Sequence, residues 1–212
     1  PGAWICKNSW GQQWGDDGYF YVSYYDTSCP YQGFLKVSAV IFNSTLKYEK
    51  NYQYDQARTN FINTEFDKVW YKNIFNATNN ELLAGVSTYF EKDSAWNLSV
   101  YVNNALKLTK SGFSKSGYWT IELGDFIPLE IGDIFEIEFQ ITHQNASVPI
   151  CEGKKFVKTY YSENISFISF DGADWIDLYD YDWNNENKAA LQVACIKAFT
   201  VLNNETFTML SH

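Results

Sequence analysis

The sequence predicts an all-β protein in which an antiparallel, jelly-roll-like sandwich follows a separate β-hairpin. Aromatic residues make up 19% of the 212 residues, and Phe, Tyr and Trp favour strands over helices. Apolar and polar residues alternate with a period of two in several short segments. Clusters of Asn, Asp, Gly and Ser separate these segments, as turns between strands do. A succession of short strands with regular turns is typical of sandwiches.

The clearest strand is predicted between Ile134 and Ile141. Phe135, Ile137 and Phe139 would point to one side of a sheet, while the glutamates and the glutamine between them would point to the other. This alternation indicates a strand with one buried face. Further strands are predicted at residues 34–42, 82–90, 98–102, 118–123, 165–170 and 193–202.

The first residues predict a hairpin of their own. An apolar strand at residues 3–7 is followed by a polar, Gly-rich connection and a second strand at residues 19–25, which is the pattern of two antiparallel strands joined by a loop. We therefore divide the chain into a hairpin at residues 1–26, a sandwich domain at 27–203 and a tail at 204–212.

Charge, hydropathy and cysteine spacing argue against nucleic-acid binding, a membrane-spanning segment and a zinc site. The net charge of −9 and the isoelectric point near 4.7 disfavour binding to nucleic acid, which requires a basic surface. No apolar run is long enough to cross a bilayer. Cys6, Cys29, Cys151 and Cys195 are too widely spaced for a zinc knuckle. Cys151 and Cys195 could form a disulfide in an exported protein or remain buried thiols.

Six Asn-x-Ser/Thr triplets favour an extracellular or cell-surface glycoprotein. A chain so rich in Asn could also produce such triplets by chance. The sequence does not decide between glycosylation sites and chance. The triplets begin at Asn43, Asn76, Asn97, Asn145, Asn164 and Asn204.

One local motif carries a resemblance to a known family. The stretch Ala3-Trp4-Ile5-Cys6-Lys7-Asn8-Ser9-Trp10-Gly11, followed by Trp14-Gly15 and Gly18-Tyr19, resembles the Asn region of papain-like (C1 family) cysteine peptidases. The resemblance implies that the Asn8 side-chain carbonyl accepts a hydrogen bond from the catalytic imidazole and so orients it. It also implies that the Trp10 indole covers this bond and shields it from water.

The same resemblance implies that this chain holds an incomplete triad. In the family the nucleophilic Cys precedes the Asn region by more than a hundred residues, which places it before residue 1. The two histidines, His143 and His212, lie downstream of Asn8. Cys6 belongs to an apolar strand pattern, which is typical of a packed and unreactive thiol. We therefore expect no peptidase activity from this chain alone and an upstream peptidase domain as its partner.

The longer part of the chain resembles the lectin-like domain that follows the peptidase unit in some prokaryotic surface peptidases. The resemblance rests on the order of several segments, and it implies a jelly-roll-like sandwich that binds carbohydrate or a cell surface. The segments are 52–55, 96–101, 117–121, 128–133, 166–169, 171–175 and 196–200.

An acidic and aromatic loop at residues 171–183 is the main candidate for ligand binding within this domain. Asp171, Asp174 and Asp177 could hold Ca²⁺, which prefers carboxylate oxygens, or could simply form a solvated loop. Calcium is the only cofactor that the sequence raises.

Aromatic residues alternate with acids at the end of this loop. Tyr179, Tyr181 and Trp183 would share one face if the stretch were extended, and flat aromatic faces can stack on sugar rings. In so aromatic a chain, however, such residues usually line a core or a sheet face.

These observations lead to one main functional hypothesis and two alternatives. The main one is the C-terminal part of a secreted or surface cysteine peptidase, whose sandwich binds a glycan or another cell-surface component. In the first alternative, the sandwich is a structural or completing domain without a ligand. In the second, the protein is an adhesin that carries a degenerate peptidase remnant.

Overall fold

The computed structural model describes residues 2–26, 47–153, 160–182 and 191–202, and these residues form strands and turns without any helix. None of them therefore forms a helix that could span a membrane. The chain divides into two compact units, Pro1–Thr45 and Leu46–His212. Each unit is described by itself below.

The first unit contains the predicted hairpin. Strand β1 (Ala3–Lys7) pairs antiparallel with β2 (Tyr19–Ser23), with Ala3 opposite Ser23 and Lys7 opposite Tyr19. The second strand ends at Ser23, two residues earlier than predicted. It ends there because the Asp26 amide donates to the Ser23 carbonyl at 3.0 Å and the chain turns.

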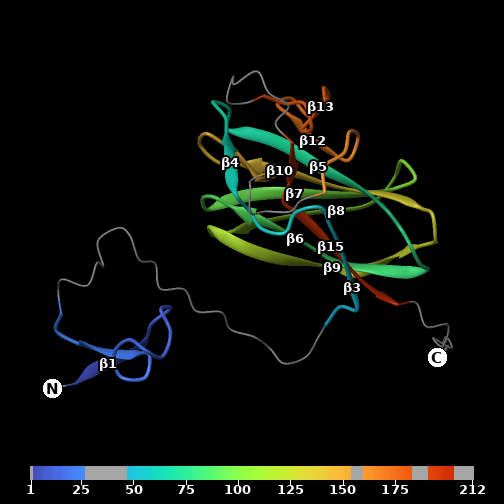
Figure 1. The fold of residues 1–212 in the computed structure, drawn as a ribbon. Helices are drawn as coiled ribbons and strands as arrows, with labels where there is room; N and C mark the ends of the chain where they lie inside the picture. Colours follow the sequence, from blue (N-terminus) through green and yellow to red (C-terminus); the bar gives the residue numbers. More distant parts are fainter. Residues whose placement is uncertain (1, 27–46, 154–159, 183–190, 203–212) are drawn as a thin grey trace. The chain divides into compact units, whose positions relative to one another are not determined.

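The second unit is the predicted antiparallel sandwich (Figure 1). One sheet has six strands in the order β13-β12-β5-β10-β7-β8, a second has four in the order β3-β15-β6-β9, and a smaller sheet has the order β14-β11-β4. The strands are β3 (Lys50–Gln53), β4 (Asn60–Asn63), β5 (Lys68–Asn76), β6 (Glu81–Phe90), β7 (Ser94–Val102), β8 (Ala105–Ser114), β9 (Gly117–Leu129), β10 (Ile134–Thr142), β11 (Ser147–Glu152), β12 (Ser166–Ser169), β13 (Ile176–Asp177), β14 (Gln192–Ala194) and β15 (Ile196–Leu202).

Strands that follow one another along the chain alternate between the two larger sheets. The chain passes from β5 to β6 and back to β7, and again from β8 to β9 and back to β10. The hairpin β7-β8 stays within one sheet, and its turn places Asn103 and Asn104 at φ of 49° and 64°, as a tight hairpin turn requires. This alternation gives the sandwich its jelly-roll character and confirms the predicted fold class.

The core lies between the six-stranded and four-stranded sheets. The Tyr71 hydroxyl on β5 lies 2.9 Å from the Thr88 hydroxyl on β6, and the Tyr52 ring on β3 meets the Phe135 ring on β10 edge to face at 5.2 Å. Strand β10 lies between β5 and β7. Its alternate residues from Phe135 to Ile141 are buried, which confirms the alternation seen in the sequence.

Most of the other predicted strands are also present. Strands β6, β7 and β9 cover the predicted segments at 82–90, 98–102 and 118–123, and β12 lies within the predicted segment at 165–170. The predicted strand 34–42 and the predicted tail at 204–212 lie outside the described residues.

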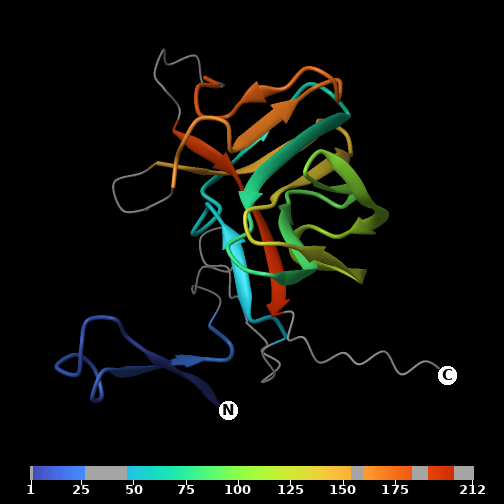
Figure 2. The ribbon, with the colours of Figure 1, turned by 90° about the vertical axis from the view of Figure 1, so that its right-hand side faces the viewer.

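The predicted strand 193–202 is in fact two strands, because the chain leaves one sheet for another at Cys195. Its first part, β14, belongs to the three-stranded sheet, and its second part, β15, belongs to the four-stranded sheet. Cys195 is a buried thiol whose pKa is raised by burial. Figure 2 shows β15 (red) beside β3 (cyan), in agreement with their antiparallel pairing.

Close packing at one glycine gives a stability prediction. A Cβ at Gly112 would lie 2.4 Å from the Trp96 ring, which is 7% exposed and donates from Nε1 to the Ser114 hydroxyl at 3.0 Å. We expect Gly112→Ala to displace the ring and to lower the free energy of unfolding by about 1–3 kcal/mol. Urea denaturation would measure this loss. An unchanged midpoint would show that Trp96 shifts without cost.

Candidate functional site

The loop of the first hairpin fixes the side chain of Asn8 from both ends. The Asn8 amide nitrogen donates to the Trp14 carbonyl at 3.0 Å, and its side-chain carbonyl accepts from the Trp10 amide at 2.7 Å. The Asn8 backbone amide donates to the Gly18 carbonyl at 2.8 Å. The loop thereby holds the Asn8 amide in one orientation.

Aromatic rings surround this fixed amide. The Trp10 and Trp14 rings meet edge to face at 5.0 Å, and the Trp14 and Phe20 rings do so at 5.5 Å. Together with Lys7 and Asn8, they line an open, largely apolar hollow of about 640 Å³. The Trp10 side chain is 74% exposed, so the indole stands at the surface of the hairpin.

The geometry leaves Asn8 able to orient a further group. An amide oxygen has two lone pairs, and the described residues occupy one of them, through the Trp10 amide. The second lone pair can accept a hydrogen bond from an imidazole. Both histidines of the sequence, His143 and His212, belong to the second unit. The catalytic role of Asn8 and Trp10 stays a prediction.

Two of the three predicted calcium ligands, Asp171 and Asp177, accept hydrogen bonds from backbone amides. One Asp171 oxygen accepts from the amides of Ala173 and Asp174 at 2.8 and 2.9 Å, and these bonds hold the pKa of Asp171 below its usual range. Asp177 accepts from the amides of Asn164 and Tyr179 at 2.6 and 3.0 Å.

The Asp171 and Asp177 carboxylates thus stabilise turns of the backbone. Within the described ranges, no group of three Asp, Glu, His or Cys side chains is arranged to hold a metal ion. Calcium binding by Asp171, Asp174 and Asp177 stays a prediction, which melting temperatures in Ca²⁺ and in a chelator would test.

The aromatic residues of the loop are not arranged as an extended strand would arrange them. Residues 178–180 form a turn, so the premise of one shared face is wrong for Tyr179 and Tyr181. The Tyr181 ring packs against the core and lies 6.2 Å from Phe170. Trp183 lies outside the described residues. Sugar binding by Tyr179, Tyr181 and Trp183 stays a prediction.

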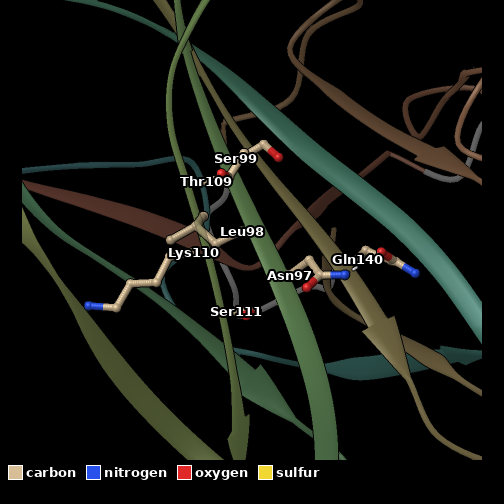
Figure 3. A pocket seen from close by; sticks show the side chains of 7 residues that line it. All are labelled: Asn97, Leu98, Ser99, Thr109, Lys110, Ser111 and Gln140. Carbon is tan, nitrogen blue, oxygen red and sulfur yellow. Dashed lines mark hydrogen bonds between the residues drawn. The ribbon is translucent and has the colours of Figure 1, made fainter.

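The structure brings several polar side chains together around a hollow that the sequence did not predict. It lies on the outward face of β10, β7 and β8, has a volume of about 360 Å³ and contains no acidic residue (Figure 3). Ser99 and Gln140 are outward positions of two predicted strands, and Asn97 immediately precedes the first of these strands, but only the register of the sheet shows that the three residues lie together. The residues around the hollow are Asn97, Leu98, Ser99, Thr109, Lys110, Ser111 and Gln140.

Comparison with known families divides the chain in a similar way. Residues 51–200 match the family described as "Lectin like domain", and residues 2–36 match the family described as "Papain family cysteine protease". Serine-repeat antigen protein 5 of Plasmodium falciparum is 35% identical over 108 residues. That alignment covers 43% of this chain and 11% of the antigen, so the chain spans only a small part of that relative.

Solved structures of one clostridial protein share the fold. The cysteine protease Cwp84 after propeptide cleavage aligns with a TM-score of 0.67 and 21% identity over 94% of this chain and 51% of that one. The cysteine protease and lectin-like domains of Cwp84, a surface layer associated protein of Clostridium difficile, align with a TM-score of 0.64 and 20% identity, over 94% of this chain and 46% of that one. The chain belongs to the lectin-like domain family, and ahead of that domain it carries a segment that matches the papain family of cysteine proteases.

Proposed function

We propose that this chain is the C-terminal part of a secreted or cell-surface papain-like cysteine peptidase, and that its sandwich holds the enzyme at a glycan or another surface component. The observation that carries the peptidase part is the Asn8 amide, which is fixed by Trp10 and Trp14 and retains an acceptor position. The tethering part is supported by membership of the lectin-like family. Tethering would raise the concentration of the enzyme at its target.

In this proposal, Asn8 and Trp10 position a histidine that the upstream part of the protein supplies. The Asn8 carbonyl accepts the imidazole N–H and selects one ring orientation, so that the other nitrogen can accept a proton from the Cys thiol. Proximity of the Trp10 indole excludes water and strengthens this bond. The present chain contributes neither the nucleophile nor the base, and by itself it does not hydrolyse peptides.

Replacing Asn8 in the complete protein tests the peptidase part. We expect Asn8→Ala to lower kcat/KM on a fluorogenic peptide about tenfold or more, because one orienting hydrogen bond contributes about 1.4 kcal/mol or more to the transition state. Asn51→Ala, an exposed asparagine on β3, is the matched control. Equal activity of the wild-type and Asn8→Ala proteins would refute the assigned role.

A glycan array tests the tethering part. Binding of the complete protein to any arrayed glycan, with loss of binding when the sandwich is deleted, is the expected result. A folded protein that binds no glycan and no cell surface would leave the sandwich as a structural or completing domain. If instead the complete protein binds glycans without any peptidase activity, it is an adhesin with a degenerate remnant.

A further inference from the structure

The outward face of the six-stranded sheet carries a row of side chains that crosses four strands. In the register of the sheet, Trp70 on β5 is opposite Gln140 on β10, Gln140 is opposite Asn97 on β7, and Asn97 is opposite Ser111 on β8. Neighbouring strands lie roughly 4.8 Å apart, so the row is about 14 Å long. We call these four residues the polar row.

Two amides at the centre of the row orient each other. The Asn97 amide nitrogen donates to the Gln140 side-chain carbonyl at 2.7 Å, and the two side chains point toward one another across the strands (Figure 3). This bond leaves the Asn97 carbonyl as an acceptor and the Gln140 amide nitrogen as a donor. No described residue bonds to either of these two groups, which therefore face solvent as a fixed acceptor and donor pair.

One end of the row is aromatic and immobilised. A Cβ at Gly172 would lie 3.0 Å from the Trp70 ring, so the turn at Gly172 packs directly against the indole. A ring that is already held in place loses little conformational freedom when a ligand binds. The Trp70 side chain remains partly exposed, and its accessible part is suited to contact the apolar face of a sugar ring.

Charge around the row favours an uncharged ligand. Lys72 pairs with Glu136 at 2.8 Å, and both side chains are mostly buried, so neither offers a free charge. Lys110 borders the hollow, but its ammonium donates to the Glu122 carbonyl at 2.6 Å and points away from the amides (Figure 3). Glu138, the outward acidic residue nearest to Gln140 on β10, lies opposite Lys72 on β5 and Ser99 on β7. The four residues of the polar row are neutral, and both Glu138 and the net charge of −9 of the whole chain disfavour an anionic ligand.

We propose that the polar row binds a neutral oligosaccharide, with Trp70 against a sugar ring and the Asn97–Gln140 pair bonded to hydroxyl groups. Paired donors and acceptors beside an aromatic ring match the alternation of polar edges and apolar faces in carbohydrates. The proposal rests on glycan binding as the function of the sandwich, and it assigns that function to a different surface from residues 179–183.

The test compares matched variants on an array of neutral hexose and N-acetylhexosamine oligosaccharides, with sialylated and sulfated glycans alongside. The complete protein is made in a host without N-glycosylation, because Asn97 begins an Asn-x-Ser triplet and an attached glycan would cover the row. We expect Gln140→Ala and Trp70→Ala each to weaken binding to the neutral glycans about tenfold. Gln53→Ala should change nothing, because Gln53 forms an equivalent exposed amide pair with Asn51, at 2.9 Å, on β3 of the other sheet.

A variant that obstructs the row with a larger side chain distinguishes loss of the binding surface from loss of folding. Ser111 is exposed on the edge strand β8, so Ser111→Tyr should leave the melting temperature unchanged and should also reduce binding. Binding that survives all three variants but is lost on replacing Tyr179 and Tyr181 would overturn the polar row and leave the proposed function intact. A folded protein that binds no arrayed glycan would overturn the row together with glycan binding.

Two further outcomes would also overturn the proposal. Binding confined to sialylated or sulfated glycans would contradict the neutral chemistry of the row. Self-association in sedimentation that Ser111→Tyr abolishes, without any glycan binding, would identify a second copy of the chain as the occupant of this face.

Discussion

Replacing Lys197 by Met is expected to lower the free energy of unfolding by about 3–5 kcal/mol at pH 7, because it leaves a buried carboxylate without its cation. Asp55 has a side chain that is 0% exposed, and one of its oxygens lies 2.7 Å from the Lys197 ammonium. The ammonium also donates to the Asp55 backbone carbonyl at 3.3 Å. Chemical denaturation at neutral pH would measure the loss.

The loss should be smaller in acid. Burial already raises the pKa of Asp55, and the contacts with Lys197 oppose that rise, so the variant raises the pKa further. A carboxyl whose folded pKa exceeds its unfolded value of about 3.9 takes up protons more readily in the folded state. The folded-state pKa of Asp55 is higher in the variant than in the wild type, so the destabilisation grows as the pH rises from the wild-type value to the variant value, and it is least below both. Equal losses at pH 4.5 and pH 7 would contradict this account.

Two controls separate charge from packing. Lys47→Met removes a lysine from an ion pair with Glu122 whose side chains are 57% and 63% exposed, and we expect no measurable change in stability. The double variant Asp55→Asn, Lys197→Met removes both buried charges and should recover part of the stability lost in the single variant. If the double variant is as unstable as Lys197→Met alone, lost packing is the cause.

Replacing Phe139 by Ala is expected to lower the free energy of unfolding by about 3–5 kcal/mol, because it opens a cavity in the centre of the sandwich. Phe139 is completely buried, and its ring stacks on Tyr71 with centroids 5.7 Å apart. It lies on β10 between β5 and β7, where neighbouring strands restrict relaxation. Urea denaturation monitored by tryptophan fluorescence measures the change.

The matched control is Phe126→Ala on β9. Phe126 is 58% exposed, and its removal should change the free energy of unfolding by less than about 0.5 kcal/mol. A similar loss in both variants would indicate that strand propensity, and not burial, determines the cost.

The sequence predicts those strands in which buried and exposed residues simply alternate. Strand β5 was not predicted, and its residues show why. Its inward positions include Asn73, which interrupts the apolar pattern, while the outward Trp70 and Ile74 are apolar. Asn73 is fully buried because its side chain donates to the Ala194 carbonyl at 3.0 Å and accepts from the Ser166 hydroxyl at 2.7 Å. These partners are about a hundred residues away, so local sequence gives no sign of them. Strand β8 was missed because most of its residues are exposed at the sheet edge.

The two candidate sites also differ in how far apart in the sequence their residues lie. Asn8, Trp10 and Trp14 lie within seven residues of one another, and their contacts are made inside one loop, so a sequence motif can represent them. The polar row depends on the register between four strands, from Trp70 to Ser111 through Gln140. A one-residue shift in any pairing would move its side chains to the opposite face. Alternation within one strand shows which face a side chain takes, but it does not show which residues of the neighbouring strands stand opposite it.

The pairing of β3 with β15 determines how the sandwich would respond to a mechanical pull. Lys50, at the start of β3, is opposite Thr200, near the end of β15, and the Glu49 amide also donates to the Thr200 carbonyl at 3.0 Å. Both ends of the domain therefore leave from the same end of one strand pair. A force that separates the ends would act across the strands at this one end, so the hydrogen bonds between β3 and β15 would break one after another. The bonds would not share the force, as they do when two strands are pulled along their length. For a protein stretched between two attachments, the strands β3 and β15 would be the first to part.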